Sequence, residues 1–302
     1  MKESGLKFAE SDYPALFLDA NEASARAKSS YLNLTKGTLV LLVLGAALAA
    51  ASAAVDAHRP VFAVASALVL GLSAFFTIFL KAAKPEHSWY AARAVAESVK
   101  SMTWRYVMGA EPYFINLPPA QAEKKFIWSL SSIAKERKQL APALGGKFVD
   151  FPQISETMRT IRSSSSEERL SIYLRERIKN QRKWYSQQTS YNRSAENRYF
   201  VSILLFQFLA LTAAILLVSH PESKVKLTGL FTSLAGALIA WLQLNQHKEL
   251  AQSYCVTGLD LGLVQEQAQY IKNDKDLSDF VGDAENAISR EHTLWIARRD
   301  RA

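Results

Sequence analysis

Hydrophobic residues gather in four long uncharged segments, arranged as two pairs. The first pair covers residues 37–55 and 60–80, and the second covers residues 199–219 and 227–246. Each segment has about the 20 residues that an α-helix needs to cross a bilayer. A core helix of a soluble protein usually keeps a charged stripe toward water, and these segments have none. The pattern therefore predicts four transmembrane helices rather than helices buried in a soluble core.

Short polar bridges join the two members of each pair. The first bridge is residues 56–59 and the second is "HPESKVK", residues 220–226. Because such short connections join antiparallel neighbours, each pair is expected to form a helical hairpin. An offset of 160 residues lays the first hairpin on the second, which indicates duplication of a two-helix unit. Both hairpins should then cross the membrane in the same orientation.

The first segment also has to be compared with a cleavable signal peptide. The letters "ASAA" near its end imitate a cleavage site, but 36 mostly polar residues precede the segment. A signal peptide has a much shorter charged region before its apolar stretch. We therefore interpret the segment as a retained transmembrane helix.

The basic residues predict which side of the membrane each part faces. The two bridges hold three of the 36 lysines and arginines, namely Arg59, Lys224 and Lys226. Lysine and arginine concentrate in cytoplasmic loops. Both termini and the central region, residues 81–198, are therefore expected in the cytoplasm.

The net charge of +8 is unevenly distributed. The central region carries 21 basic and 11 acidic residues, a net +10, whereas the tail after Gln246 carries 7 and 10, a net −3. A basic region held against an anionic inner leaflet explains this excess. No nucleic-acid-binding motif accompanies it, so the bilayer is the expected partner and nucleic acid is not.

Apolar positions at helical spacing continue through the polar parts. They predict a helix that continues the second span and ends at Gly109, a helix over residues 120–140, and a helix that starts at Ser165 or Ser166 and runs into the third span. The tail predicts one helix over residues 247–271 and a final one over residues 280–299. The expected fold is an all-α integral membrane protein, with two membrane hairpins and long cytoplasmic helical extensions.

The sequence shows none of the common catalytic or metal-binding motifs. It has no phosphate-binding loop with lysine, no HExxH and no G-x-S-x-G, and its single cysteine, Cys255, excludes an intramolecular disulfide. Spans without ionisable residues argue against ion-coupled transport. We expect no catalytic, cofactor-binding or metal-binding residue, and no enzyme activity. The histidines without metal-ligand spacing are His58, His87, His220, His247 and His292.

Small residues recur every fourth position on three of the segments, a spacing that lets helix backbones approach closely. They predict a homo-oligomer, although packing within one chain explains any single stripe equally well. The stripes comprise Gly45, Ala49 and Ala53, then Ala63, Ala67 and Gly71, and finally Gly229, Ser233 and Ala237.

Hydrogen-bonding side chains are few within the segments. Hydroxyl groups in membrane helices usually bond their own backbone or a neighbouring helix. The alternative is that these side chains line a narrow pore closed by dewetting between apolar rings. The candidate pore-lining residues are Ser66, Ser73, Thr77, Gln207 and Gln243.

Two motifs resemble a known family. The hairpin followed by "HSWYAARAVAESVKSMTWRYVMGAEPYF", and the ending "AENAISREHTLWIARR", are similar to the SLATT proteins, the SMODS- and SLOG-associating two-membrane-helix effectors. The chain resembles a tandem form, with one unit over residues 1–155 and a second over residues 156–302.

The resemblance implies a function. SLATT proteins are associated with bacterial conflict systems, beside nucleotide-synthesising or nucleotide-sensing partners. It implies an inner-membrane effector that oligomerises and forms a pore when triggered. The chain shows no recognisable sensor domain, so the trigger would come from a partner or from a ligand of the cytoplasmic helices. Two alternatives stay open, a non-conducting scaffold for cytoplasmic partners and a constitutive ion channel.

Overall fold

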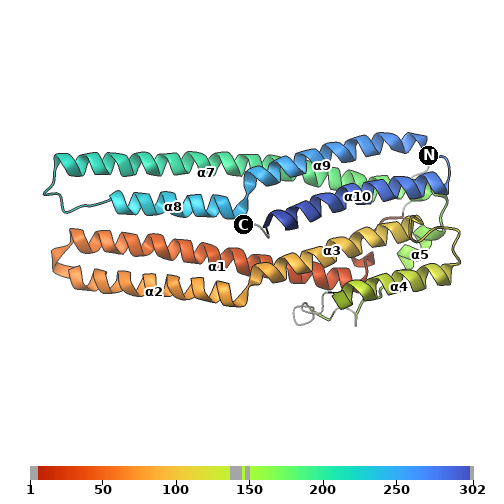
Figure 1. The fold of residues 1–302 in the computed structure, drawn as a ribbon, viewed down its shortest axis with the longest axis horizontal. Coiled ribbons are helices and arrows are strands. Elements are labelled where there is room, and N and C mark those ends of the chain that lie inside the picture. The colour runs from red at the N-terminus through yellow and green to blue at the C-terminus, as the bar shows by residue number, and fades with distance from the viewer. Residues whose placement is uncertain (1–5, 137–144, 147–149, 300–302) are drawn as a thin grey trace. The chain divides into compact units, whose positions relative to one another are not determined.

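The computed structural model describes residues 6–136, 145–146 and 150–299, the last ten of these by backbone only. Over these residues the chain is helical and has no β-strand (Figure 1), which confirms the predicted all-α class. In chain order the α-helices are α1 (Ala15–Ala54), α2 (Arg59–Ala83), α3 (Pro85–Met108), α4 (Pro119–Glu136), α5 (Glu156–Ser163), α6 (Ser166–Ile172), α7 (Asn180–Ser219), α8 (Thr228–Asn245), α9 (His247–Gln267) and α10 (Asp274–Arg299).

The helices form two compact units. Unit 1 consists of the described residues of 1–28, 86–189 and 252–302, and unit 2 consists of residues 29–85 and 190–251. Unit 2 therefore contains the four predicted membrane segments, whereas unit 1 contains most of the charged sequence. Helices α1, α7 and α9 each contribute residues to both units.

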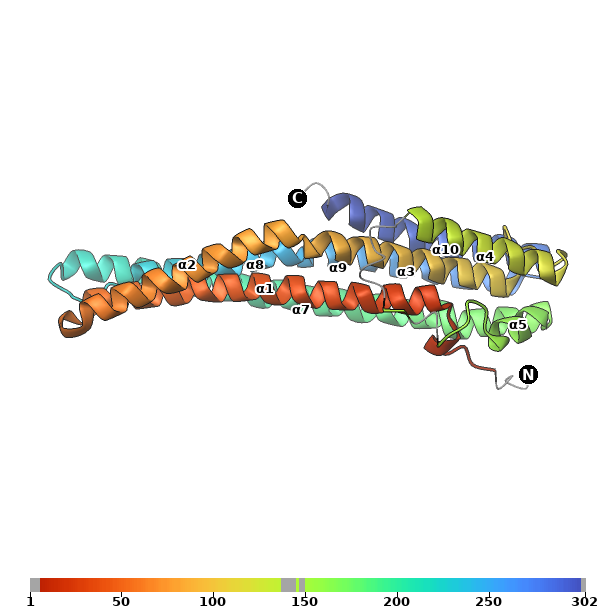
Figure 2. The ribbon, with the colours of Figure 1, turned by 90° about the horizontal axis from the view of Figure 1, so that it is seen from below.

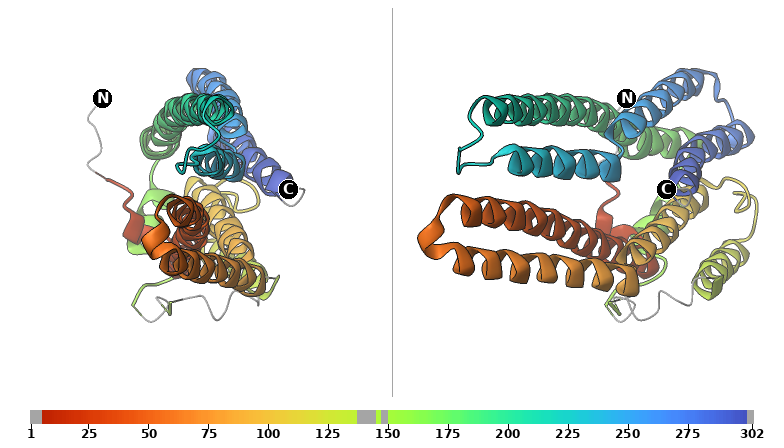
Figure 3. Two further views of the ribbon diagram at one scale, coloured as in Figure 1. Left: turned by 90° about the vertical axis from the view of Figure 1, so that its left-hand side faces the viewer. Right: turned by 60° about the vertical axis from the view of Figure 1, so that its left-hand side comes forward.

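Unit 2 consists of two helical hairpins, α1–α2 and α7–α8, whose bridges lie at the same end (Figures 1 and 3). An ion pair between Asp56 and Lys224 connects the two bridges. Within the first hairpin, Gly45 lies so close to Leu70 that an added Cβ would be 2.6 Å from Leu70 Cδ2. A larger residue at this position would therefore force the Leu70 side chain to move if the two helices kept this separation.

Three helical stretches of the described chain are long and apolar enough to cross a membrane. They are Ala15–Ala54, Asp56–Met108 and Ser166–Ser219, and only 17%, 11% and 6% of their most apolar windows are buried inside the chain. Helix α8 is not among them. Its 18 residues rise about 27 Å, and Gln243 and Asn245 interrupt its apolar sequence near the end.

The first and last helices begin earlier than the sequence pattern predicts. Helix α1 starts at Ala15, far ahead of the predicted span at residue 37, because its first turns bury Phe17, Ala20 and Ala23 in unit 1. Helix α10 starts at Asp274 rather than residue 280. Asn273 caps it, since its Oδ1 accepts a hydrogen bond of 2.9 Å from the Asp276 N–H, which is the usual role of asparagine at a helix start.

The continuous helix predicted from the second span into α3 is wrong, because the structure breaks it at Lys84. Lys84 has a φ of 44° and Gln246, between α8 and α9, has a φ of 50°. Each N–H bonds the carbonyl four residues earlier, at 3.0 and 3.1 Å. The left-handed conformation costs a non-glycine residue about 1 kcal/mol. The repeated break aligns the two halves with an offset of 162 residues (246 − 84), two more than hydropathy suggested.

Unit 1 packs around an aromatic cluster where the first turns of α1 lie along α3 (Figure 2). Trp104 Nε1 donates a hydrogen bond of 2.8 Å to the Tyr13 hydroxyl. The Phe8 and Tyr13 rings meet edge to face at 4.8 Å, and Trp104 meets Tyr173 at 5.6 Å. Such buried aromatic pairs add stability beyond the apolar area they cover.

Two predicted helix ends are confirmed in unit 1. Helix α3 ends before Gly109, whose φ of 67° suits glycine, and α6 starts after Ser165, whose hydroxyl accepts a hydrogen bond of 3.3 Å from the Glu168 N–H. Helix α4 is described as far as Glu136, and its predicted end at residue 140 lies outside the described residues.

Candidate functional site

The structure places two of the candidate pore-lining residues inside the first hairpin. The Ser66 hydroxyl donates a hydrogen bond of 2.8 Å to the Gly45 carbonyl, and the Ser73 hydroxyl donates one of 3.2 Å to the Thr38 carbonyl. Both serines are buried between α1 and α2. In this conformation their hydroxyls hold the hairpin together, which agrees with the packing alternative.

The other three candidates lie on surfaces of unit 2. Thr77 Oγ1 donates to the Ser73 carbonyl at 3.0 Å, so its hydroxyl is satisfied by its own helix. Gln207 on α7 and Gln243 on α8 are exposed. At 1.5 Å per residue, Gln207 lies about 12 Å into the predicted third span and Gln243 about 5 Å from the end of the fourth. The structure therefore does not bring the candidates to one common depth.

The stripes of small residues differ in how far the chain covers them. The stripe on α2 is exposed throughout, and Gly71 has no atom within 4 Å of a Cβ added to it. On α1 the stripe is covered only at its Gly45 end, and on α8 it is exposed or partly buried. The exposed α2 members are Ala63, Ala67 and Gly71, the exposed α1 members are Ala49 and Ala53, and the α8 members are Gly229, Ser233 and Ala237.

A polar and aromatic cluster closes the second hairpin at its break. Trp241 Nε1 donates a hydrogen bond of 3.0 Å to the Tyr199 hydroxyl, and the His247 ring stacks on Tyr199 at 5.8 Å. His247 Nδ1 lies 2.7 Å from Asn192 Oδ1. Burial, and secondarily the charge of Arg198, lower the pKa of His247. The cluster ties α9 to α7 at the end of the predicted span, where amphipathic rings are common.

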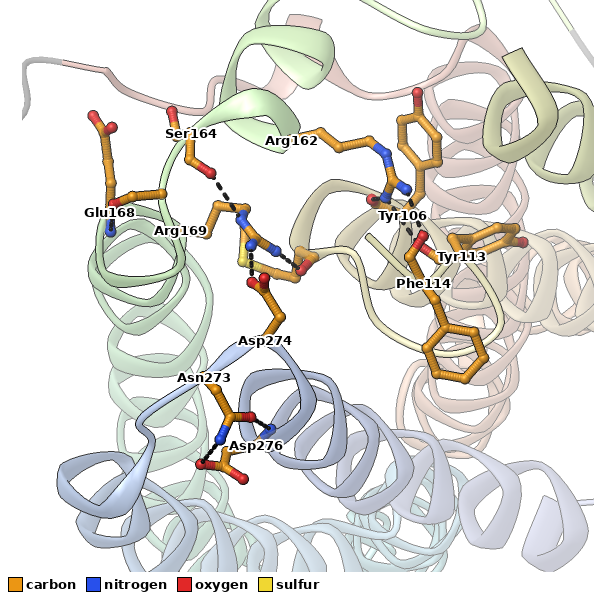
Figure 4. A network of polar contacts seen from close by, with 12 residues as sticks. Tyr106, Tyr113, Phe114, Arg162, Ser164, Glu168, Arg169, Asn273, Asp274 and Asp276 are labelled. Carbon is orange, nitrogen blue, oxygen red and sulfur yellow. Dashed lines mark hydrogen bonds and ion pairs between the residues drawn. The ribbon is translucent and has the colours of Figure 1, made fainter. Parts of the chain in front are cut away.

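Unit 1 contains a polar network, built on three arginines from α5, α6 and the π-helical segment η5 (Tyr173–Lys179). Arg162 donates hydrogen bonds to the carbonyls of Tyr106 at 2.5 Å and of Tyr113 and Phe114 at 3.0 Å (Figure 4). Its guanidinium also lies 5.0 Å from the centre of the Tyr106 ring. Burial lowers the pKa of Arg162. Tyr106 lies in the last turn of α3, where its carbonyl also accepts a hydrogen bond of 3.2 Å from the Gly109 N–H, and Tyr113 and Phe114 lie in the loop after α3. Arg162 therefore fixes this loop to the end of the helix.

Arg169 extends this network to α10. It donates to the carbonyls of Met108 and Ser164 and forms an ion pair with Asp274 (Figure 4). Two further contacts join the end of α3 and the loop after it to α10. Arg105 Nη2 donates to Asn286 Oδ1 at 2.8 Å, and the Glu111 N–H donates to the Ser278 hydroxyl at 3.1 Å. The loop after α3 is thus fixed to the last helix.

The third arginine forms a buried ion pair. Arg177 donates to Glu285 through Nε at 2.9 Å and Nη2 at 2.8 Å, and the Tyr173 hydroxyl donates to the same carboxylate at 2.9 Å. The two charged side chains are 2% and 0% exposed. Burial alone would lower the pKa of Arg177, but the charge of Glu285 and its hydrogen bonds outweigh this and raise it. Burial also raises the pKa of Tyr173.

The chemistry of the network is that of a structural contact between segments of the chain. Its arginines bind carbonyls and carboxylates, and among the described residues no three histidine, cysteine or acidic side chains are placed to hold a metal ion. The sequence reading missed this site because its arginines were counted as part of the basic excess held against an anionic inner leaflet. The spacing of eight residues between Arg169 and Arg177 would have been a useful signal, because it places both near one side of the continuous helix of α6 and η5. Arg162 lies on α5, before the extended Ser164 and Ser165, so helical spacing does not relate it to them.

Two family models match the chain, one in each half. The model of SMODS and SLOG-associating 2TM effector domain 3 matches residues 14–170, and that of domain 1 matches residues 173–295. The matches assign α5 and most of α6 to the first domain, whereas the resemblance to a tandem form implies the division after residue 155. No curated protein and no solved structure matches the chain.

We predict that Glu285→Gln destabilises the protein by about 3 kcal/mol, because it leaves the buried Arg177 charge without a counterion. Thermal unfolding of the detergent-solubilised protein measures the loss. The control is Asp279→Asn, which removes an exposed ion pair with Lys275 and should change stability by less than about 0.5 kcal/mol. Equal effects of the two variants would contradict a stabilising role for the buried pair.

The second prediction concerns Lys100, a partly buried side chain whose ammonium lies 5.9 Å from the Tyr13 and Phe17 ring centres. Burial, with the charge of Arg177 second, lowers its pKa to about 8 from 10.5. The unfolded chain therefore binds more protons between these values, so the free energy of unfolding should rise with pH across this window.

Between pH 7.5 and 9.5 the expected rise is about 1 kcal/mol, reduced from the full shift because Lys100 is partly exposed. Thermal unfolding at a series of pH values measures it. Lys100→Met should remove the rise, while Lys275→Met, at an exposed lysine, should keep it. A pH profile that is flat in the wild-type protein would refute the assignment.

Proposed function

Because the chain belongs to the SMODS and SLOG-associating 2TM effector family in a tandem form, we propose that it is a triggered pore-forming effector. Domains of this family are effectors of conflict systems. In the proposed function, copies of the chain assemble in the inner membrane of a bacterium and permeabilise it during an antiphage response. The trigger comes from a nucleotide-sensing or nucleotide-synthesising partner.

Gln207 carries the proposal. Its side chain is exposed on α7, within a stretch of which only 6% of the most apolar window is covered by the chain. An amide without a hydrogen-bond partner in hydrocarbon costs several kcal/mol. A neighbouring copy removes this cost, either by bonding the amide directly or by enclosing water beside it.

The neighbours of Gln207 suit a hydrophobic gate. Leu204 and Leu211 lie three residues before and four residues after it and are also exposed, so they occupy the same face of α7. In a ring of copies they would form apolar constrictions on either side of the amides. Such constrictions close a pore by dewetting without any charge. Since Ser66 and Ser73 are bonded within the first hairpin, Gln207 is the preferred lining residue, with Gln243 nearer the cytoplasmic end.

The proposed topology has four spans with both termini in the cytoplasm. The bridges lie at one end of unit 2 and are joined by the Asp56–Lys224 pair, as expected for hairpins of equal orientation. The distribution of lysine and arginine places this end outside the cytoplasm. The polar network of unit 1 would then face the cytoplasmic partner, in a role that binds and transmits rather than catalyses.

Topology reporters test this arrangement. Fusions after Val55 and after Ser219 should be active in the periplasm, and fusions after Gly145 and after residue 302, which lies outside the described residues, should be active in the cytoplasm. The Ser219 fusion also tests α8, since α8 has to return the chain across the bilayer. A cytoplasmic signal from either bridge would overturn the topology.

We predict that Gln207→Leu lowers ion release from liposomes containing the purified protein at least tenfold, because the wetted position is lost. Gln207→Asn, which keeps an amide, should retain flux. The matched control is Phe208→Leu, a change at the next exposed position of the same helix. Growth inhibition on overexpression should follow the same order.

Three outcomes contradict parts of the proposal, namely the pore itself, the lining role of Gln207 and the effector role. If the oligomeric wild-type protein releases no ions from liposomes and its overexpression beside the partner that triggers it leaves growth unchanged, the scaffold alternative replaces the pore. If Gln207→Leu only lowers the amount of folded protein, the amide has a packing role. If overexpressed wild-type protein conducts but leaves growth unchanged, a constitutive channel fits better.

A further inference from the structure

Helix α9 has an apolar face that the chain leaves uncovered. Val256, Leu259 and Leu263 are 58%, 66% and 69% exposed, and they follow one another at spacings of three and four residues. This is the spacing of a seam that packs against another helix. All three lie beyond residue 246, where the predicted fourth span ends, so lipid does not cover them. Asp260 and Glu266 are exposed beside them, and we call these five residues the acidic α9 face.

Helix α4 presents a different uncovered face. Its inner side buries Ala122, Phe126 and Leu130, whereas Trp128 points away from the core and is 78% exposed. Tryptophan at the centre of a surface patch is typical of an interface. The exposed lysines around it are Lys124, Lys125 and Lys135, and with Trp128 we call them the basic α4 face.

The two faces complement each other. Each has an apolar centre, and the flanking charges are of opposite sign. Helix α9 contains one lysine, Lys248 in its first turn, against three acidic residues. On α4, Glu123 is bonded to Arg159 at 2.9 Å, which leaves the lysines dominant around Trp128. Complementary charge around an apolar centre selects a partner and its register.

Within unit 1, α4 and α9 lie on opposite edges (Figure 1). They therefore cannot cover each other in one chain. We propose that the acidic α9 face of one copy packs against the basic α4 face of the next copy. Such a head-to-tail contact uses two different surfaces, so it continues from copy to copy and closes into a ring when the rotation allows. The contact rests on the proposed homo-oligomer, and it does not require that the oligomer conducts.

Cysteine cross-linking between differently tagged copies tests the contact. In the full-length chain carrying Cys255→Ser, one tagged copy carries Trp128→Cys and a second copy with another tag carries Leu263→Cys. Oxidation of membranes from cells that express both should give a dimer containing both tags. Each variant expressed alone should give at least tenfold less dimer.

Charge reversal supplies the matched control. In the Trp128→Cys copy, the added pair Lys124→Glu and Lys125→Glu should lower the mixed dimer at least tenfold. Reversal of the partner copy by Asp260→Lys and Glu266→Lys should restore it. Lys275→Glu, at a lysine 85% exposed on α10, should leave it unchanged. Thermal unfolding of each variant identifies any that fail to fold.

Several outcomes overturn the contact. A dominant dimer of the Leu263→Cys variant alone would show that α9 seams pair with each other. No mixed dimer in membranes where the detergent-extracted protein has an oligomer mass would show that copies meet elsewhere. Ion release from liposomes tests the pore independently of the contact between copies. Cross-linking without ion release would retain the contact and reject the pore, and ion release without cross-linking would do the reverse.

Discussion

Hydrocarbon solvates charge so poorly that a single lysine, arginine or aspartate at the centre of a bilayer costs several kcal/mol. A chain with uncharged helices of this length has to place its charges elsewhere, and unit 2 keeps them at its bridges and at the opposite end of its hairpins. The remaining charge is concentrated in unit 1, including side chains that end up inside its core. Arg162, Arg169 and Arg177 are buried there, and each is neutralised or bonded by groups from another segment.

These arginines also determine how the two repeats are joined. The loop after α3 ends a helix and so exposes carbonyls without intrahelical partners. Arg169 satisfies the Met108 carbonyl, Arg162 bonds the Tyr113 carbonyl in the loop, and Arg169 continues to Asp274 at the start of α10. The first domain match ends at residue 170 and the second starts at residue 173, so the network crosses from one domain to the other. Through Arg169, the start of α10 and the end of α3 are therefore fixed to each other.

Periodicity and hydropathy predicted the helical class, the two hairpins and the helix starts that have local caps, such as Ser165 before α6. These features depend on neighbours within one or two turns, which the sequence displays directly. The early start of α1 was missed because Phe17, Ala20 and Ala23 are separated by polar residues, and only the packing against α3 makes them core. The break at Lys84 was missed because neither it nor Gln246 is glycine. Ser66 and Ser73 share a face, as predicted, but whether that face meets α1 or a pore depends on distant pairing that no local pattern encodes.

The surfaces of unit 2 offer little basis for choosing a partner. Apolar residues in a membrane helix contact lipid as well as protein, so association there depends on close packing and on rare polar groups. Outside the bilayer an uncovered leucine or tryptophan is exposed to water, so burying it against a partner lowers the free energy. Charge around such residues can also reject a wrong partner. In the proposed assembly, unit 1 would therefore set the order and register of neighbouring copies, while Gln207 and the small residues of α2 would set how tightly the membrane helices close.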